Sequence, residues 1–99
     1  MLRSTMNRGF SLTFENGLTV SVQFGTSSLC ERLDYYPPAG NDLRNAVTES
    51  PDAEIAIWDK ENNWYEFGHG RVKGYCSADD VARWITKVRE AETLNSIQP

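Results

Sequence analysis

The sequence predicts an α+β fold: an antiparallel sheet of four to five strands, made of two hairpins, with one C-terminal helix packed on its apolar face. Two observations carry this prediction. Two pairs of segments alternate apolar and polar residues, as half-buried strands do, and one later stretch repeats its apolar residues at helical spacing. The chain has 99 residues, which suits one domain with one hydrophobic core.

The first hairpin is expected in the stretch "GFSLTFENGLTVSVQF". A two-residue Asn16-Gly17 loop would place Phe14 opposite Thr19, and the two apolar stripes would then point to opposite faces of the sheet. A loop that also includes the preceding glutamate pairs Phe14 with Leu18 and brings the stripes together. Each large side chain contributes roughly 1.5–3 kcal/mol when buried, so we predict the three-residue loop, with its glycine left-handed in a bulge. The predicted core residues are Phe10, Leu12, Phe14, Leu18, Val20, Val22 and Phe24.

The segment 25–52 follows neither a strand pattern nor a helix pattern, and it is acidic. Structureless segments of this length are uncommon inside compact domains, so we expect a short helix or turn near 28–33 or 42–47. Tyr35 and Tyr36 precede two prolines, which favour extended backbone. The segment is a candidate flap over one face of the sheet.

The second hairpin is expected in "AEIAIWDKENNWYEF", and the length of its loop decides which side chains share a face. A loop of even length would put Glu66 on the apolar face, where an unpaired charge is costly. We therefore predict an odd loop, 59–63 or 61–63, which places Trp58 opposite Trp64. The apolar face then holds Ile55, Ile57, Tyr65 and Phe67, and the other face holds Glu54, Ala56, Trp58, Trp64 and Glu66. The following "GHGRVKGYC" predicts a turn and a fifth short strand around Val72.

The stretch "SADDVARWITKVREAETL" predicts the helix. Ser77 is a natural N-cap, and Asp80 lies three residues later, as in a capping box. The apolar residues with i, i+3, i+4, i+7 spacing are Val81, Trp84, Ile85 and Val88. We expect a single domain over residues 9–94, with a flexible N-terminal tail over 1–8 and a C-terminal tail over 95–99.

The net charge of −4 belongs to one part of the chain. Residues 31–66 carry three basic and nine acidic side chains, a net −6, whereas the segments 1–30 and 67–99 each carry +1. Such an acidic region favours basic partners and repels phosphate, so direct nucleic-acid binding is not expected. No apolar run is long enough for a membrane span or resembles a secretory signal, and we expect a cytoplasmic protein with reduced cysteines.

No motif for catalysis or for a cofactor is recognisable. His69 and Cys76 could form a nucleophilic pair in principle, but no orienting third group or oxyanion element accompanies them. The stretch "DKENNW" only loosely resembles a calcium loop, because Trp64 stands where the loop requires glycine. Glycine-rich phosphate loops are also missing from the sequence. We therefore predict that the protein is not an enzyme and expect no metal or cofactor.

The most informative residues are Trp58 and Trp64. One interpretation is that the segment 25–52 folds over them and completes a second small core. The other is an exposed aromatic pair ringed by carboxylates, the arrangement of an interface hot spot inside a polar rim. The candidate partner-binding residues are Trp58, Trp64, Glu54, Asp59, Glu61, Glu66, Tyr35 and Tyr36.

Three stretches, "GFSLTFENGLTVSVQFG", "AEIAIWDKENNWYEF" and "GYCSADDVARWITKV", together resemble a set of short, uncharacterised proteins of phages and prophages. The resemblance covers about residues 9–88, with 25–52 matching least. It implies a virus-encoded accessory protein that acts in the cytoplasm of a bacterial host. Small acidic phage proteins of this kind often bind and block host machinery, including CRISPR effectors and other defence systems.

The leading expectation is thus a non-enzymatic phage protein that inhibits a host protein or complex by binding its basic surface; a second copy of the chain is another candidate partner. One alternative is an oligomeric sponge that sequesters a nucleotide immune signal. Another is a minor virion or assembly component. The sponge would need cations for phosphate, for which the candidates are Arg32, Arg44, Arg71 and Lys73.

Overall fold

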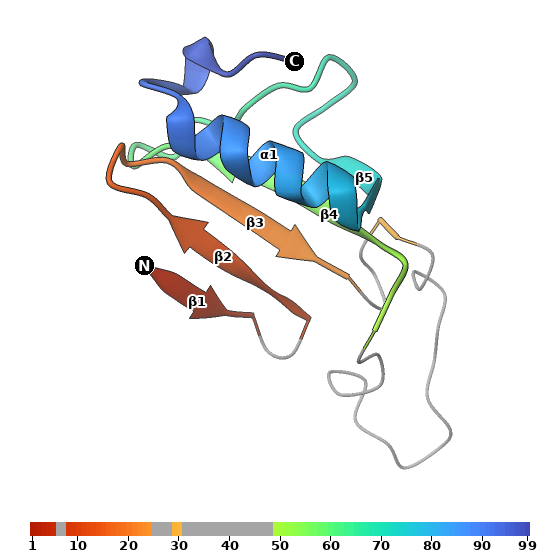
Figure 1. Ribbon diagram of the computed structural model, residues 1–99. Helices are drawn as coiled ribbons and strands as arrows, with labels where there is room; N and C mark the ends of the chain where they lie inside the picture. The colour runs from red at the N-terminus through yellow and green to blue at the C-terminus, as the bar shows by residue number, and fades with distance from the viewer. Residues whose placement is uncertain (6–7, 25–28, 31–48) are drawn as a thin grey trace.

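The computed structural model describes residues 1–5, 8–24, 29–30 and 49–99. This part of the chain forms a five-stranded antiparallel sheet with one α-helix packed across one face, which confirms the predicted fold class (Figure 1). The strands lie in sequence order, each beside the next. The elements are β1 (Leu2–Ser4), β2 (Gly9–Thr13), β3 (Thr19–Gln23), β4 (Asp52–Trp58), β5 (Lys73–Ser77), α1 (Ala78–Glu90) and the 3₁₀ helix η2 (Leu94–Ser96).

The β2–β3 hairpin has the predicted three-residue loop. Leu12 lies opposite Val20, and the Phe14 amide donates to the Leu18 carbonyl over 2.9 Å. Gly17 closes the turn by donating to the Phe14 carbonyl at 3.0 Å, with a φ of 86° in the left-handed region. All the apolar side chains of the hairpin strands therefore share one face of the sheet.

Asn16 fastens this turn to the end of the helix. Its side-chain nitrogen donates to the carbonyls of Val88 at 2.8 Å and Ala91 at 2.7 Å, and its side-chain oxygen accepts from the Leu18 amide at 3.0 Å. The last carbonyls of a helix have no partner within it, so one asparagine satisfies the helix terminus and the turn together.

The helix begins as the sequence predicts. The Ser77 hydroxyl accepts from the Asp80 amide at 3.2 Å, and the Asp80 carboxylate accepts from the Ser77 amide at 3.1 Å, which completes a capping box. Trp84 and Val88 are buried against the sheet, while Val81 and Ile85 are partly buried and pack against the same core. The apolar stripe of α1 therefore faces the core.

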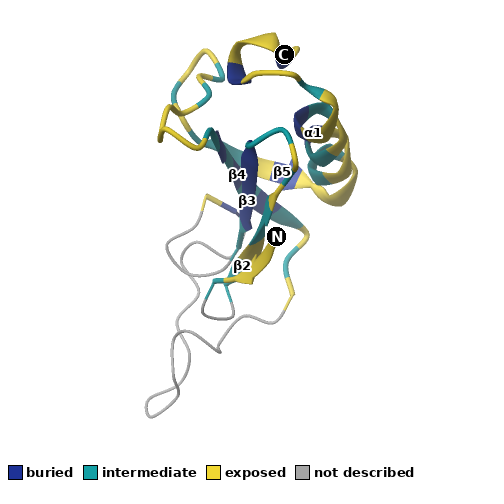
Figure 2. Cartoon of the chain, turned by 90° about the vertical axis from the view of Figure 1, so that its left-hand side faces the viewer, coloured by how far each residue is buried: buried dark blue, intermediate teal, exposed yellow. Residues whose placement is uncertain are grey.

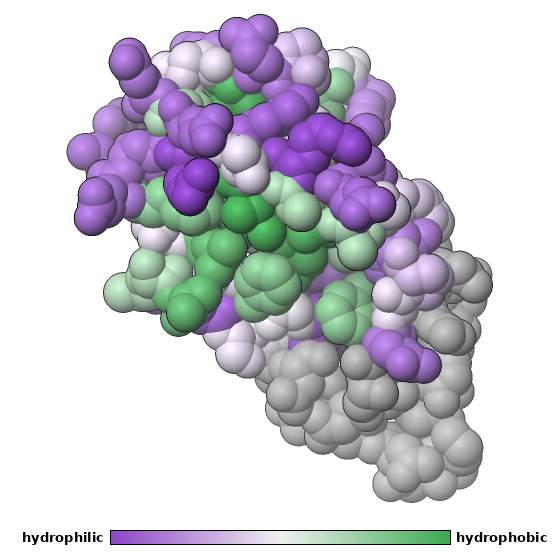
Figure 3. All heavy atoms as spheres, in the orientation of Figure 1, coloured by the Kyte–Doolittle hydropathy of each residue, from purple (hydrophilic) through white to green (hydrophobic). Residues whose placement is uncertain are grey.

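The core lies between α1 and strands β3, β4 and β5, because the helix packs mainly over these three strands. The apolar side chains of β2 extend beyond the helix: Phe10 is 36% exposed, and Leu12 is only partly buried. An apolar region is accordingly visible beside the helix in the space-filling view (Figure 3). The prediction that the whole stripe is core is confirmed for Leu18, Val20 and Val22 and is wrong for Phe10; Phe14 and Phe24 are half-buried.

The second hairpin has the predicted odd loop, 59–63, but its second strand is shorter than predicted. Trp58 does lie opposite Trp64 across the five-residue loop 59–63, and the Tyr65 amide donates to the Ile57 carbonyl at 2.9 Å. This pairing is only an isolated bridge, however, and the stable neighbour of β4 is β5, which the sequence placed slightly earlier, around Val72.

Aromatic packing explains why the chain leaves the sheet after the bridge. Tyr65 and Phe67 lie on the core side, as predicted, with ring centroids 5.8 and 5.1 Å from that of Trp84. Their rings also contact each other edge to face at 5.0 Å. Three packed aromatic side chains bury a large apolar area beside the helix, and β5 takes the free edge of β4.

Both predicted tails are partly wrong. Leu2–Ser4 form β1, which pairs with β2, with Leu2 opposite Leu12. At the other end, Ile97 is 5% exposed and belongs to the core, because η2 folds the chain back beside α1. Short apolar stretches of this kind carry too little periodicity to be recognised as structured from the sequence alone.

The predicted flap is largely outside the described residues, including both expected helical turns and the tyrosines Tyr35 and Tyr36. Within 25–52, the carbonyl of Leu29 accepts from the Tyr75 amide at 2.8 Å, and the Leu29 amide donates to the Glu54 carboxylate at 2.8 Å. This contact places Leu29 beside β5. Asp52, at the end of the predicted segment, already belongs to β4.

Candidate partner-binding surface

The sheet has two unlike faces. α1 lies on one side only, as the turned view shows (Figure 2). On the other face, the registers place Thr19 opposite Trp58 and Ser21 opposite Ala56, so the hydroxyl-rich row of the first hairpin continues into the tryptophan pair of β4. Thr19 and Ser21 are themselves buried, at 7% and 8% exposure. The hydroxyls of Thr13 and Thr19 are hydrogen-bonded at 2.8 Å.

Trp58 and Trp64 form a compact pair on this second face. Their ring centroids are 5.0 Å apart and their planes are inclined by 32°. Trp58 is half-buried, whereas Trp64 is 39% exposed. The pair therefore has one ring that is held by the sheet and one that remains available to a partner.

Of the four carboxylates predicted around this pair, two have a structural role. Asp59 accepts from the amides of Glu61 and Asn63, both at 2.9 Å, and from the Asn63 side chain at 3.1 Å. These hydrogen bonds, led by the one from the Asn63 amide, lower the pKa of Asp59 below its ordinary value of 3.8. Glu54 accepts from Leu29, as described above.

The other two carboxylates are on the surface. Glu66 forms an ion pair with Arg71 at 3.3 Å, and both side chains are more than half exposed. Glu61 is exposed in the loop 59–63. Sequence reasoning missed the pairing of Arg71, because two residues on opposite sides of an irregular turn follow no spacing rule. The segment 58–67 nevertheless holds three carboxylates, Asp59, Glu61 and Glu66, against one lysine, Lys60, so the loop that carries Trp64 is acidic.

The pair of His69 and Cys76, which the sequence did not favour as a nucleophilic pair, gains no support from the geometry. The Cys76 thiol is buried beneath the helix and lies 3.7 Å from the Lys73 carbonyl. Burial raises the pKa of Cys76, which is opposite to the shift of an activated thiol. His69 is exposed, with its ring 6.3 Å from that of Phe67.

Among the described residues, no group of three or more His, Cys, Asp or Glu side chains is arranged to hold a metal ion. No helix in this same part of the chain is long and apolar enough to cross a membrane.

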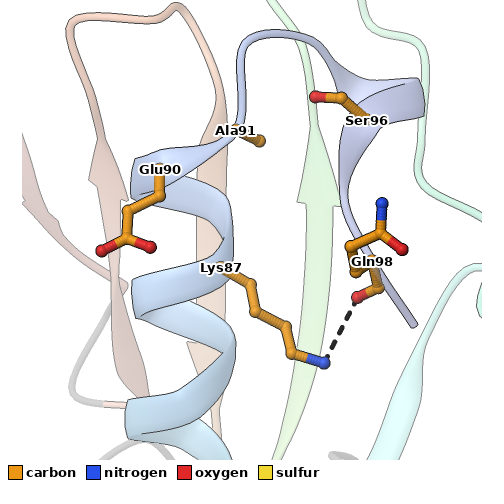
Figure 4. A pocket seen from close by; sticks show the side chains of 5 residues that line it. All are labelled: Lys87, Glu90, Ala91, Ser96 and Gln98. Atoms are coloured by element: carbon orange, nitrogen blue, oxygen red, sulfur yellow. Dashed lines mark hydrogen bonds between the residues drawn. The ribbon is translucent and has the colours of Figure 1, made fainter.

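A small pocket of about 200 Å³ lies between the end of α1 and the C-terminal segment (Figure 4). The ammonium of Lys87 donates to the carbonyls of Gln98 at 3.2 Å and Pro99 at 3.0 Å, and it lies 4.6 Å from the centre of the Trp84 ring. Ligand pockets are usually larger, at roughly 300–1,000 Å³. The Lys87 ammonium in this pocket already binds the chain's own carbonyls, so the pocket is a poor ligand site.

The structure thus brings together Trp58, Trp64 and Asp59 with the exposed Glu61, and it keeps Glu54 and Glu66 in contact with other residues of the chain. Tyr35 and Tyr36 lie outside the described residues. In comparisons with known proteins, no family model, no curated protein and no solved structure matches the chain.

Proposed function

We propose that the protein is a non-enzymatic binding protein of the phage accessory type, which blocks a host protein or complex, such as a CRISPR effector or another defence system. The Trp58–Trp64 pair is the anchor, and it docks on a basic, groove-bearing surface of the partner. One observation carries the proposal: Trp64 is 39% exposed, and the segment 58–67 that carries it holds three carboxylates and one lysine.

The physical basis is the usual division of work at protein interfaces. Large aromatic side chains near the centre of an interface supply most of the binding energy, commonly about 2 kcal/mol or more each. The charges around them speed up association and select partners of opposite charge, but they add little affinity. Glu61 and Glu66, which lie close to Trp64 along the chain, would act in this second way.

The loop 59–63 favours such an anchor because it is already ordered. Asp59 holds its turn through three hydrogen bonds. The half-buried Trp58 restricts the Trp64 ring to one side. A pre-ordered aromatic side chain loses less conformational entropy on binding than a free one does.

The test compares two matched variants in bacteria that carry an active CRISPR system and are challenged with a targeted phage. The double variant Trp58→Ala, Trp64→Ala removes the anchor, and Tyr75→Ala removes an exposed aromatic residue from β5, where Tyr75 is 57% exposed. We expect the wild type and Tyr75→Ala to restore plaque formation and the double variant to lose at least about tenfold. Normal inhibition by a folded double variant would refute the proposal.

Salt dependence provides a second test with a purified partner complex. Because the acidic region contributes mainly through long-range attraction, raising the ionic strength should weaken binding, and Glu61→Lys should slow association. The same purification would reveal a nucleotide sponge, since native mass spectrometry would find a bound nucleotide. The sponge is not proposed, because only two of its four candidate cations, Arg71 and Lys73, lie among the described residues, and Arg71 pairs with Glu66.

A further inference from the structure

Among the described residues, the edge of the sheet at β1 presents backbone groups that have no partner strand. Met1 exchanges hydrogen bonds with Thr13 in both directions, at 2.7 and 2.8 Å, and the Thr5 amide donates to the Gly9 carbonyl at 3.1 Å. Alternation along an antiparallel pair then directs the N–H and C=O groups of Leu2 and Ser4 away from β2. β1 is the outermost strand on its side of the sheet, so these groups form an open edge.

An uncovered apolar strip lies directly beside this edge, on the helix side of the sheet. The registers put Leu2, Leu12 and Val20 in one row and Ser4, Phe10 and Val22 in the next. Leu2 is 80% exposed and Phe10 36%, whereas Val20 and Val22 beneath the helix are buried. A helix is about 10 Å wide and strands are about 4.8 Å apart, so one helix cannot cover five strands.

The positive charge near the edge indicates which kind of partner it can bind. The first fourteen residues contain Arg3 and Arg8 and no carboxylate. The Arg3 guanidinium forms no ion pair with any residue that the structure describes; it contacts only the Met1 sulfur at 3.6 Å. Arg3 projects to the face opposite Leu2, since it lies across from Ser11.

A second copy of the chain fits this edge poorly. If two copies paired through all their outward backbone groups, Leu2 would face Ser4 of the second copy, and Arg3 would face Arg3 of that copy. Like charges directly opposite each other destabilise a strand pair. Charged residues at an edge are a common means of preventing such self-association.

We propose that the β1 edge takes an extended segment of a partner protein, which adds antiparallel to the sheet as a sixth strand. Its alternate residues are apolar and lie opposite Leu2 and Ser4, on the same face as Phe10, and its intervening residues are acidic, opposite Arg3. Backbone hydrogen bonds to Leu2 and Ser4 supply affinity, and the alternating side chains supply specificity. This surface is independent of the function proposed for the tryptophan pair and has the opposite charge preference.

The probe is a short capped peptide in which valines alternate with glutamates, and the control is the same peptide with lysines in place of the glutamates. Amide shifts in NMR spectra of the full chain should change at Leu2–Ser4 and Phe10–Leu12 when the glutamate peptide is added. The glutamate peptide should bind at least about threefold more tightly than the lysine peptide. Equal affinity for both peptides, or shifts confined to Trp64, would overturn the proposal.

Two variants test the geometry. Ser4→Pro removes an outward N–H without touching a hydrogen bond to β2, so the protein should keep its melting temperature and bind the glutamate peptide about fivefold more weakly. Arg3→Glu should reverse the preference between the two peptides. If Ser4→Pro folds and binds unchanged, the peptide does not add to this edge, and a dimer of the wild type in sedimentation would assign the edge to a second copy instead.

Discussion

The two hairpin turns of the sheet behave differently, although both follow a well-alternating strand. The β2–β3 turn closes in three residues and the chain stays in the sheet. After β4, the chain makes one bridge, Trp58 to Trp64, and then leaves; β5 returns to the same edge only at Lys73. The alternation of apolar and polar residues therefore determines which face a side chain takes, but not which segment becomes the neighbouring strand.

What decides the neighbour is the best available packing for the side chains that follow the turn. Leu18 and Val20 find their apolar partners in β2 and beneath α1, so strand pairing and burial agree. Tyr65, whose amide still bonds to the Ile57 carbonyl, and Phe67 pack on Trp84, and the strand pairing with β4 ends there. In that segment burial and strand pairing compete, and burial is favoured.

The largest expected loss of stability comes from Trp84→Ala. Trp84 is buried, and removing a buried tryptophan side chain typically costs about 3–5 kcal/mol of unfolding free energy. We expect a loss of this size in urea unfolding, together with weakened amide protection at Tyr65 and Phe67. Trp64→Ala is the control, since its ring is partly exposed and should cost much less. Equal losses for the two variants would contradict the role assigned to Trp84.

The sequence was sufficient for the parts of the fold that depend on local rules. The capping box at Ser77, the left-handed Gly17 and the position of Trp58 opposite Trp64 all follow from spacing within a few residues. The strand β1 and the docked Ile97 could not be predicted in this way, because a few residues carry no period and their order depends on distant neighbours.

The candidate surface was predictable to a similar extent. Parity along β4 was enough to bring Trp58 and Trp64 together on the face away from the helix. The roles of the surrounding carboxylates were not predictable, because Glu54 and Glu66 have partners, Leu29 and Arg71, that follow no regular spacing. Charge counts gave the sign of the surface, while hydrogen bonds determine which charges remain available.

The first turn has its own sensitive point, Asn16→Ala. This change removes the donor to the Val88 and Ala91 carbonyls and the acceptor for the Leu18 amide. Leaving such groups unsatisfied costs about 1–3 kcal/mol, which should appear as a lower midpoint of thermal or urea unfolding. Asn16→Asp keeps the acceptor but places a negative charge at the helix C-terminus, so it should be at least as destabilising. Wild-type stability of both variants would refute the link between turn and helix.

The mildest test uses acid, because only the second turn depends on a titrating group. Hydrogen bonds, chiefly from the Asn63 amide, hold the pKa of Asp59 below 3.8 in the folded chain. The stabilisation is therefore complete above pH 3.8 and is lost as the pH falls through the lowered folded pKa. The pKa of Asp80 is lowered too, led by its bond from the Ser77 amide, so global unfolding cannot separate the two groups.

A local readout can separate them. In an NMR titration, the amide signals of Glu61 and Asn63 should shift together with the Asp59 carboxyl as the pH falls below 3.8, while that of Gly17, in a turn held by Asn16, should stay constant. Asp59→Asn should abolish the shift, because an amide does not titrate in this range, and it should leave the Asp80 titration intact. An Asn63 signal that moves only above pH 3.8, or moves equally in Asp59→Asn, would mean that the carboxylate does not hold this turn. The loop that presents Trp64 would then need another source of order.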